Sequence, residues 1–377
     1  MQVSAQTSAR IVDLVAAGVA TSRSELAKEL GLAPSTVSTK VAELMDAGLL
    51  AETGDGPSRG GRKPRVLTTA GTGIVVGADV GARHVRLLAL DLSGTTLKVG
   101  EFPFDIAAGP EAGVDALAGL VERFAGEQGK RLLAVGVGLP GPVEFPAGTV
   151  RVPARMPGWK DFPLRARLSE RLGLPVAVDN DTSLVALGEV AVRANRSATM
   201  IVVKAGTGIG CALVTSGAVH RGAGGVAGDI THVRVDAGAD IPCGCGNSGC
   251  LETVASGAAI VKSLRANGID VADTGELARL CDDAQPEAIA AVRTAGRLLG
   301  EVLAAVVNFV NPDVVVLAGR LASLEAFVAA VRGALYERCL PLVTQHLEVG
   351  VVTTGTDAGA RGAAALAAQV ALTGLPS

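Results

Sequence analysis

One histidine and three cysteines lie between positions 232 and 250, in the segment THVRVDAGADIPCGCGNSGCLE. His232, Cys243, Cys245 and Cys250 offer one nitrogen and three sulfur ligands. This set is enough for a closed tetrahedral zinc site with no coordination position left for catalysis. The glycines among the cysteines allow the sharp turns that bring thiolates together. The segment therefore predicts a structural Zn²⁺. The alternative is a set of reduced cysteines without a metal.

A second group of polar residues follows a short apolar run. The sequence LGLPVAVDNDTSLVALGEV predicts a buried strand that ends at Asp179, Asn180 and Asp181, where a helix begins. Ligand residues in α/β folds gather at the carboxyl ends of strands, although an aspartate there is often only a helix cap. A carboxylate beside an amide can bind sugar hydroxyls and remove a proton from one.

Two segments share a strand–turn–strand pattern: GIVVGADVGARHVRLLALDLSG at 73–94 and MIVVKAGTGIGCALVTSG at 200–217. Glycines in such turns let backbone N–H groups approach an anion closely. A single glycine-rich turn is weak evidence, but its repetition indicates a duplicated α/β fold of the actin/hexokinase type. The predicted phosphate-turn residues are Asp79, Gly81, Gly206, Thr207 and Gly208.

The first seventy residues predict a helix-turn-helix. A helix over SARIVDLVAAG is followed by one over SELAKEL, which ends at Gly31, and by another that starts near Pro34. Val37, Val41 and Leu44 are spaced for one buried face of that last helix. The opposite face, which a helix-turn-helix presents to the DNA major groove, begins with Ser35, Thr36, Thr39 and Lys40.

A basic run, SRGGRKPR, lies between two short apolar strands after this helix. Such a loop predicts a wing whose Arg62, Lys63 and Arg65 enter a narrow minor groove. The alternative is a solvated surface loop that follows an ordinary helical hairpin. Together, the helix-turn-helix and the wing favour DNA binding.

The whole chain has 377 residues, 49% of them apolar and 19% charged, with a net charge of −3. This length and composition indicate two or three compact domains rather than disorder. No apolar run approaches the roughly 20 residues that span a bilayer, and the N-terminus has no secretory-signal pattern. A cytoplasmic protein is expected, with Cys211, Cys281 and Cys339 as isolated thiols.

With these motifs in place, the sequence resembles the repressor/ORF/kinase (ROK) family, and within it the winged-helix transcriptional repressors. The resemblance covers essentially the whole chain and rests on STVSTKVAELMDAGLL, GGRKP, GLPGPV, PGW, DND, GTGIG and the cysteine segment. It implies an α/β fold: an N-terminal winged helix-turn-helix followed by a two-lobed, actin/hexokinase-like (duplicated ribonuclease H-like) sugar-kinase fold. The expected domains are 1–70, 71–185 and 186–377, with the C-terminal helix returning to the first lobe.

The resemblance also implies a ligand set. Asn180, Asp181, Asp229, His232 and Glu252 match the sugar-contacting residues, and Asp181 stands at the position of the catalytic base. Two departures concern catalysis. The family's Asp-x-Gly-Gly-Thr-Lys turn reads Asp-Val-Gly-Ala-Arg-His at 79–84, and its Glu-x-Gly-His reads Asp-Ile-Thr-His at 229–232. Because phosphoryl transfer depends on positioning, these departures predict a site without kinase activity.

A third departure concerns the charge of the ligand. Arg155 precedes the PGW turn, where the family usually places an asparagine on the sugar. A guanidinium binds phosphate or carboxylate through two parallel hydrogen bonds, so Arg155 predicts an anionic sugar. The alternative is that Arg155 points to solvent or pairs with Asp161.

The resulting hypothesis is a sugar-responsive transcriptional repressor that is not an enzyme and acts as a homodimer or homotetramer. Its partners would be operator DNA and a sugar or sugar phosphate. One alternative is an active ATP-dependent sugar kinase with an appended DNA-binding domain. A weaker one is a structural zinc protein without a small ligand.

Overall fold

The structure is a computed structural model, and it describes residues 2–16, 18–55, 65–71, 73–151, 156–193, 195 and 197–373. The chain divides into two compact units. One comprises Met1–Asp179 with Ala363–Ser377, and the other comprises Asn180–Gly362. The expected division into three domains at residues 70 and 185 stays a prediction.

The N-terminal part of the first unit is a winged helix-turn-helix. It contains α1 (Gln2–Ala16), α2 (Arg23–Leu30), α3 (Pro34–Asp46), β1 (Leu50–Asp55) and β2 (Arg65–Thr69). The side chain of Ser22 accepts a hydrogen bond from the Glu25 N–H and caps α2, and Gly31 ends that helix at φ 65°. Left-handed backbone of this kind favours glycine. Strands β1 and β2 are antiparallel, as the predicted wing requires.

The core of this domain contains the apolar residues that the helical spacing predicted. Val37 and Val41 are completely buried and Leu44 is 3% exposed, so α3 turns this face inward. They pack in one cluster with Ile11 and Leu26 from the other two helices. The opposite face of α3 is therefore the one available to a partner.

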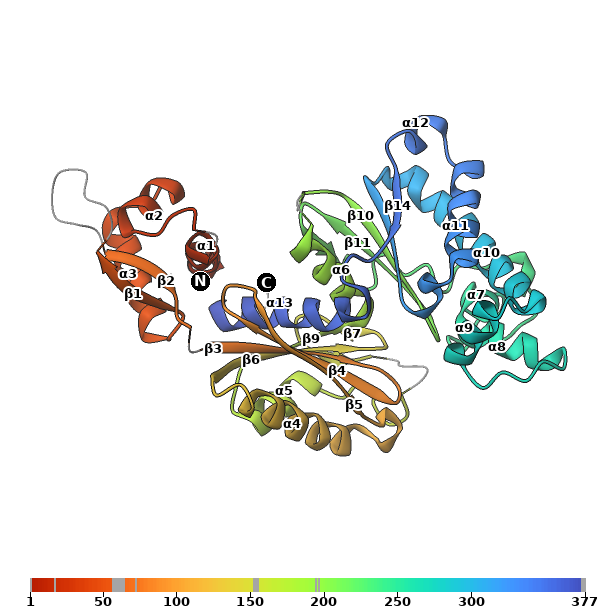
Figure 1. Ribbon diagram of the computed structural model, residues 1–377, viewed down its shortest axis with the longest axis horizontal. Coiled ribbons are helices and arrows are strands. Elements are labelled where there is room, and N and C mark those ends of the chain that lie inside the picture. Colours follow the sequence, from red (N-terminus) through yellow and green to blue (C-terminus); the bar gives the residue numbers. More distant parts are fainter. Residues whose placement is uncertain are drawn as a thin grey trace. The chain divides into compact units, whose positions relative to one another are not determined.

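The rest of the first unit is built on a five-stranded sheet in the order β5-β4-β3-β6-β9. Its strands are β3 (Gly73–Val80), β4 (His84–Asp91), β5 (Thr96–Pro103), β6 (Arg131–Leu139) and β9 (Val176–Asn180), and a small hairpin pairs β7 (Val143–Glu144) with β8 (Thr149–Val150). Helices α4 (Pro110–Gly126) and α5 (Leu164–Leu172) cover one face, and α13 (Ala358–Thr373) crosses the other (Figure 1). A Cβ on Gly136 of β6 would lie 1.9 Å from the Ala363 carbonyl oxygen, so α13 meets the sheet backbone to backbone.

The second unit repeats this plan. Its sheet has the order β12-β11-β10-β13-β14, with an antiparallel meander joined to parallel strands as in the first sheet. The strands are β10 (Met200–Ala205), β11 (Ile209–Thr215), β12 (Ala218–His220), β13 (Val314–Ala318) and β14 (Glu348–Val351). The helices are α6 (Asp181–Val192), α7 (Glu252–Ala255), α8 (Gly257–Ala266), α9 (Thr274–Asp282), α10 (Pro286–Val310), α11 (Glu325–Arg338) and α12 (Pro341–Thr344). The duplicated α/β fold predicted from the two hairpins is confirmed.

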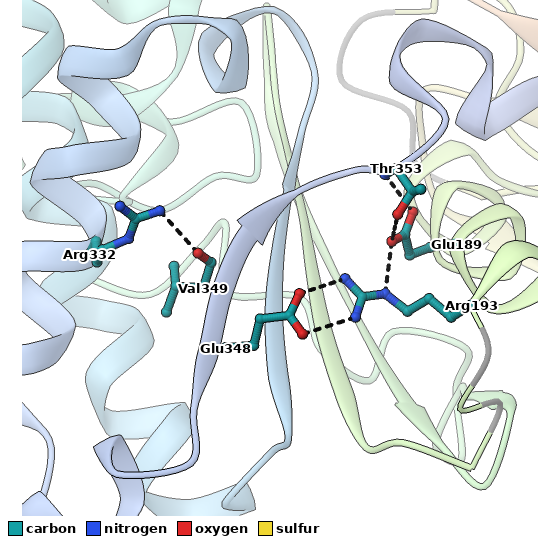
Figure 2. A network of polar contacts seen from close by, with 6 residues as sticks. All are labelled: Glu189, Arg193, Arg332, Glu348, Val349 and Thr353. Carbon is teal, nitrogen blue, oxygen red and sulfur yellow. Dashed lines mark hydrogen bonds and ion pairs between the residues drawn. The ribbon is translucent and has the colours of Figure 1, made fainter.

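A buried carboxylate joins α6 to the segment after β14. Glu189 is fully buried and accepts hydrogen bonds from Arg193 Nε at 2.8 Å and from the Thr353 N–H and hydroxyl at 3.0 and 2.7 Å. Arg193 continues to the Glu348 carboxylate on β14, as Figure 2 shows. A buried charge is stable only when such partners surround it.

Helix α6 also lies against the start of α13 without intervening side chains. A Cβ on Gly188 would lie 2.1 Å from the Ala358 carbonyl oxygen, and one on Gly362 would lie 1.7 Å from the Leu184 carbonyl oxygen. Only glycine fits such a contact.

Among the helices of the described residues, none is both long enough and apolar enough to cross a membrane.

Candidate functional site

The predicted metal ligands come together in the second unit. One ligand atom from each of His232, Cys243, Cys245 and Cys250 lies within 4.8 Å of the others. His232 Nδ1 is 3.5 Å from Cys243 Sγ, and the Cys245 and Cys250 sulfurs are 3.6 Å apart. The chain reaches this geometry through Gly246 and Gly249, whose φ values of 93° and 81° exclude most side chains.

The protonation of these thiols shows why a cation fits them. Burial raises the pKa of Cys250 to about 12, and the hydrogen bond that its thiol donates to Cys245 acts in the same direction. The Asn247 backbone N–H lowers the pKa of Cys245. A positive charge among the sulfurs would favour ionisation of the Cys250 thiol. A nitrogen and sulfur donor set this compact fits the tetrahedral preference of Zn²⁺.

Asp181 stands at the start of α6, where the sequence predicted it, and both of its carboxylate oxygens are engaged. Oδ1 accepts the Thr182 N–H at 2.7 Å, and Oδ2 accepts Lys204 Nζ at 2.9 Å. The side chains of Asp181 and Lys204 are 14% and 27% exposed. Asn180 is the helix cap, and its Oδ1 accepts the N–H groups of Thr182 and Ser183.

Lys204 was missed by sequence reasoning. The available signal was a single cation inside the apolar strand MIVVKA, one residue before a glycine turn. A lysine in a buried strand needs a carboxylate partner or a route to water. The strand alone could not reveal that the partner would be Asp181, 23 residues away in the chain.

The other predicted ligand residues gather around the start of β11. The Asp229 carboxylate accepts the Thr231 N–H at 2.9 Å, and the Glu252 carboxylate accepts the Ile209 N–H at 2.9 Å. His232 follows Thr231 directly, and its Nδ1 faces the thiols, which leaves Nε2 directed away from them. Asp229, His232 and Glu252 therefore belong to one hydrogen-bonded neighbourhood of the second unit.

The two predicted phosphate turns have the expected hairpin geometry. Asp79 is near the end of β3, in register with Arg86 and Gly138, and the Gly81 N–H donates to the His84 carbonyl at 2.8 Å. In the second turn, which is formed by Gly206, Thr207 and Gly208, the Gly206 N–H donates to the Gly208 carbonyl at 2.8 Å. Both of these glycine N–H groups are thus used to close their own hairpins.

A cavity of about 270 Å³ lies beside Asp229, with Ile201, Cys211, Leu213, Val226 and Val306 in its walls. Burial, assisted by the charge of Asp229, raises the pKa of Cys211 to about 12, so this thiol is un-ionised at neutral pH. The walls are mainly apolar and offer few partners for sugar hydroxyls. This cavity therefore does not match the predicted sugar ligand.

The DNA-contacting residues predicted on α3 lie on its outward face. Ser35, Thr36 and Thr39 are exposed, whereas Lys40 is partly buried and pairs with Glu43 at 2.6 Å. Arg65 begins β2 with its Nε 3.6 Å from the Glu52 carboxylate.

Three of the predicted residues, Arg62, Lys63 and Arg155, lie outside the described residues. Arg155 was predicted to contact the ligand or to pair with Asp161. Its suggested partner Asp161 is paired with Arg151 at 3.1 Å.

Two family models match the chain. Residues 75–370 match the ROK family, and residues 7–51 match winged helix-turn-helix DNA-binding. Among curated relatives, the xylose repressor of Bacillus subtilis is 31% identical, over 78% of this chain and 77% of its own length. A glucokinase of Halalkalibacterium halodurans is 30% identical, over 78% of this chain and 94% of its own length.

Solved structures show the same two kinds of relative. A ROK family transcriptional regulator, described as a homolog of the E. coli MLC protein, superposes with a TM-score of 0.81 and 25% identity, covering 99% of this chain and 97% of its own. A ROK family glucokinase from Streptomyces griseus, in complex with glucose and AMPPNP, superposes with a TM-score of 0.70 and 27% identity. It covers 78% of this chain and 99% of its own. The regulator thus matches nearly the whole chain.

Proposed function

Since the chain belongs to the ROK family and carries an N-terminal winged helix-turn-helix, we propose that it is a transcriptional repressor whose DNA binding responds to a sugar. The relatives named xylose repressor support this function, as does the regulator that matches over 99% of the chain. Because its target is DNA, the protein would act in the cytoplasm.

The observation that carries the proposal is the outward face of α3. The apolar face of α3 packs into the domain core. On the opposite face, Ser35, Thr36 and Thr39 are exposed in the N-terminal half of the helix. In helix-turn-helix proteins this part of the second helix contacts base edges in the major groove. Arg62, Lys63 and Arg65 would add electrostatic contacts from the wing. Paired domains in a homodimer or homotetramer would bind a palindromic operator.

The ligand site would bind a sugar without phosphorylating it. Asn180, Asp181, Asp229, His232 and Glu252 supply carboxylate, amide and imidazole groups that can bind hydroxyls. A kinase would need Asp181 as a general base within reach of the sugar hydroxyl. Here its oxygens are engaged by Lys204 and by the Thr182 N–H. The first glycine turn also presents Ala82, Arg83 and His84 instead of a threonine hydroxyl and a lysine ammonium.

The cysteine–histidine cluster would hold Zn²⁺ as a structural ion. His232, Cys243, Cys245 and Cys250 would occupy all positions of a tetrahedral ion, which leaves none for a reacting group. When bound, the ion would stabilise the thiolates and fix the fold of this loop. His232 Nε2 would then remain for a sugar hydroxyl. Arg155 would favour an anionic sugar.

One experiment separates the repressor from the kinase. An operator is first selected from random duplexes with the purified protein. Its affinity is then measured with and without D-xylose, D-glucose and their phosphate esters, and ADP release is followed with the same sugars and ATP. The expected result is a sugar-dependent change in DNA affinity without ADP release. ADP release that disappears in Asp181→Asn would instead establish the kinase.

A further inference from the structure

The backbone of Ile209 is held from both sides by the segment that carries the cysteines. Ile209 is the first residue of β11. Its N–H donates to Glu252 Oε2 at 2.9 Å, and its carbonyl accepts the Thr231 hydroxyl at 3.0 Å. Thr231 is only 8% exposed, so water competes little for this bond. The start of β11 therefore depends on two side chains from outside its own hairpin.

Both side chains are adjacent to candidate metal ligands. Thr231 directly precedes His232, and Glu252 is two residues after Cys250. The Glu252 N–H donates to the Thr231 carbonyl at 3.0 Å, which joins the two segments to each other. An ion bound by His232 and Cys250 would fix the spacing of these segments, and with it the positions of both side chains.

The start of β11 in turn determines the ligand site. In the β10–β11 register, Ala205 is opposite Ile209 and Lys204 is opposite Gly210. A Cβ on Gly210 would lie 2.1 Å from Thr182 Oγ1, so β11 packs tightly against Thr182, the residue after Asp181. A shift of β11 at Ile209 would therefore move the partners of Asp181: Lys204 across the hairpin, and Thr182 on α6.

We propose that metal occupancy of the cysteine–histidine cluster controls the order of the β10–β11 turn and of the Asp181 site through Thr231 and Glu252. This inference rests on the zinc site proposed above but not on the repressor function. Thr231 and Glu252 act here as positioning residues, because they hold the Ile209 peptide in place. Without the ion, His232 and Cys250 are no longer fixed relative to each other, and both bonds to Ile209 loosen.

The test is hydrogen exchange of the full-length protein, followed by mass spectrometry of peptides that cover residues 206–213. Protein loaded with one equivalent of Zn²⁺ is compared with protein stripped by a chelator. We expect exchange in this peptide to become at least about tenfold faster after stripping, because local opening becomes easier. Residues 314–318 of β13 in the same sheet provide the internal reference and should change far less.

Two variants test the route. Thr231→Val removes the hydroxyl with little change of shape and should accelerate exchange at 206–213 even in zinc-loaded protein. Thr231→Ser keeps the hydroxyl and should restore slow exchange. Unchanged exchange after stripping, or failure of the protein to take up zinc, would overturn the proposal. Equal exchange in Thr231→Val and the parent, at equal zinc content, would remove Thr231 from it. Neither sugar nor DNA is present, so these results are independent of the repressor function.

Discussion

Lys204 and Asp181 form an ion pair at the start of α6, with Nζ and Oδ2 2.9 Å apart and both side chains largely shielded from water. The carboxylate at the position of a kinase's base is thus neutralised by a strand residue of the same unit. Both oxygens of Asp181 thus accept hydrogen bonds within the protein, one from Lys204 and one from the Thr182 N–H.

Lys204→Met should destabilise the second unit by about 1.5–3 kcal/mol, because it leaves a partly buried carboxylate without its charged partner. Asp181→Asn combined with Lys204→Met should cost less than the sum of the single variants, with a coupling energy of about 1–2 kcal/mol. Urea unfolding of the four proteins gives this cycle. Strictly additive effects would show that the pair makes no net contribution. Lys40→Met is the matched control: the carboxylate it leaves unpaired, that of Glu43, is 55% exposed, so the change should cost less than about 1 kcal/mol.

Glu189→Gln should lower the free energy of unfolding by about 2–4 kcal/mol, because one buried oxygen becomes a donor facing the donors of Arg193 and Thr353. Calorimetric melting of the full chain measures this loss. Glu348→Gln is the control: its side chain is 59% exposed, so the change should cost less than about 1 kcal/mol. Equal losses in the two variants would contradict the role of burial.

On DNA, Ser35→Ala with Thr36→Ala should reduce the preference for the selected operator over random duplex, since base-edge contacts carry specificity. Arg65→Ala should weaken binding to both duplexes alike and reduce the slope of log affinity against log salt by about 1, because one phosphate contact is lost. Fluorescence anisotropy at several salt concentrations checks both outcomes. An unchanged slope would exclude Arg65 from the interface.

Low pH should reduce the folding stability of the winged helix-turn-helix domain, because Glu52 becomes protonated. Its hydrogen bond from Arg23 lowers the pKa of Glu52 below the ordinary 4.5. The pair therefore stabilises the folded domain above pH 4.5, and this contribution is lost as the pH falls through the lowered value. Glu52→Gln should cost at most about 1 kcal/mol at pH 7 and less at pH 3. Hydrogen exchange of residues 23–46 across this pH range tests the trend, and Arg23→Met should reproduce it. A cost that persists undiminished at pH 3 would rule out the ionised carboxylate as its source.

Local signals predicted much of this structure from the sequence. Pro34 begins α3, Gly31 ends α2, and the two glycine turns close β3–β4 and β10–β11, because each depends on a few neighbouring residues. The spacing of His232 and the cysteines likewise predicted a cluster that the chain does form. The family and fold expected from these motifs are confirmed by the matches over residues 7–51 and 75–370.

Contacts between segments distant in the chain were not predictable in this way. Glu189 has the sequence neighbourhood of an ordinary helix residue, and its burial depends on Thr353, 164 positions later. The bonds from Thr231 and Glu252 to Ile209 likewise join residues 22 and 43 positions apart. Such contacts depend on how the elements pack, which periodicity and turn chemistry do not encode.

The glycine contacts between α6 and α13 couple the movements of these two helices. Gly188 and Gly362 leave no side-chain cushion between the two backbones, so neither helix can rotate freely past the other. Asp181 is at the N-terminal end of α6, about two turns from Gly188. A sugar that binds Asp181 and shifts α6 would therefore move the first turn of α13 with it.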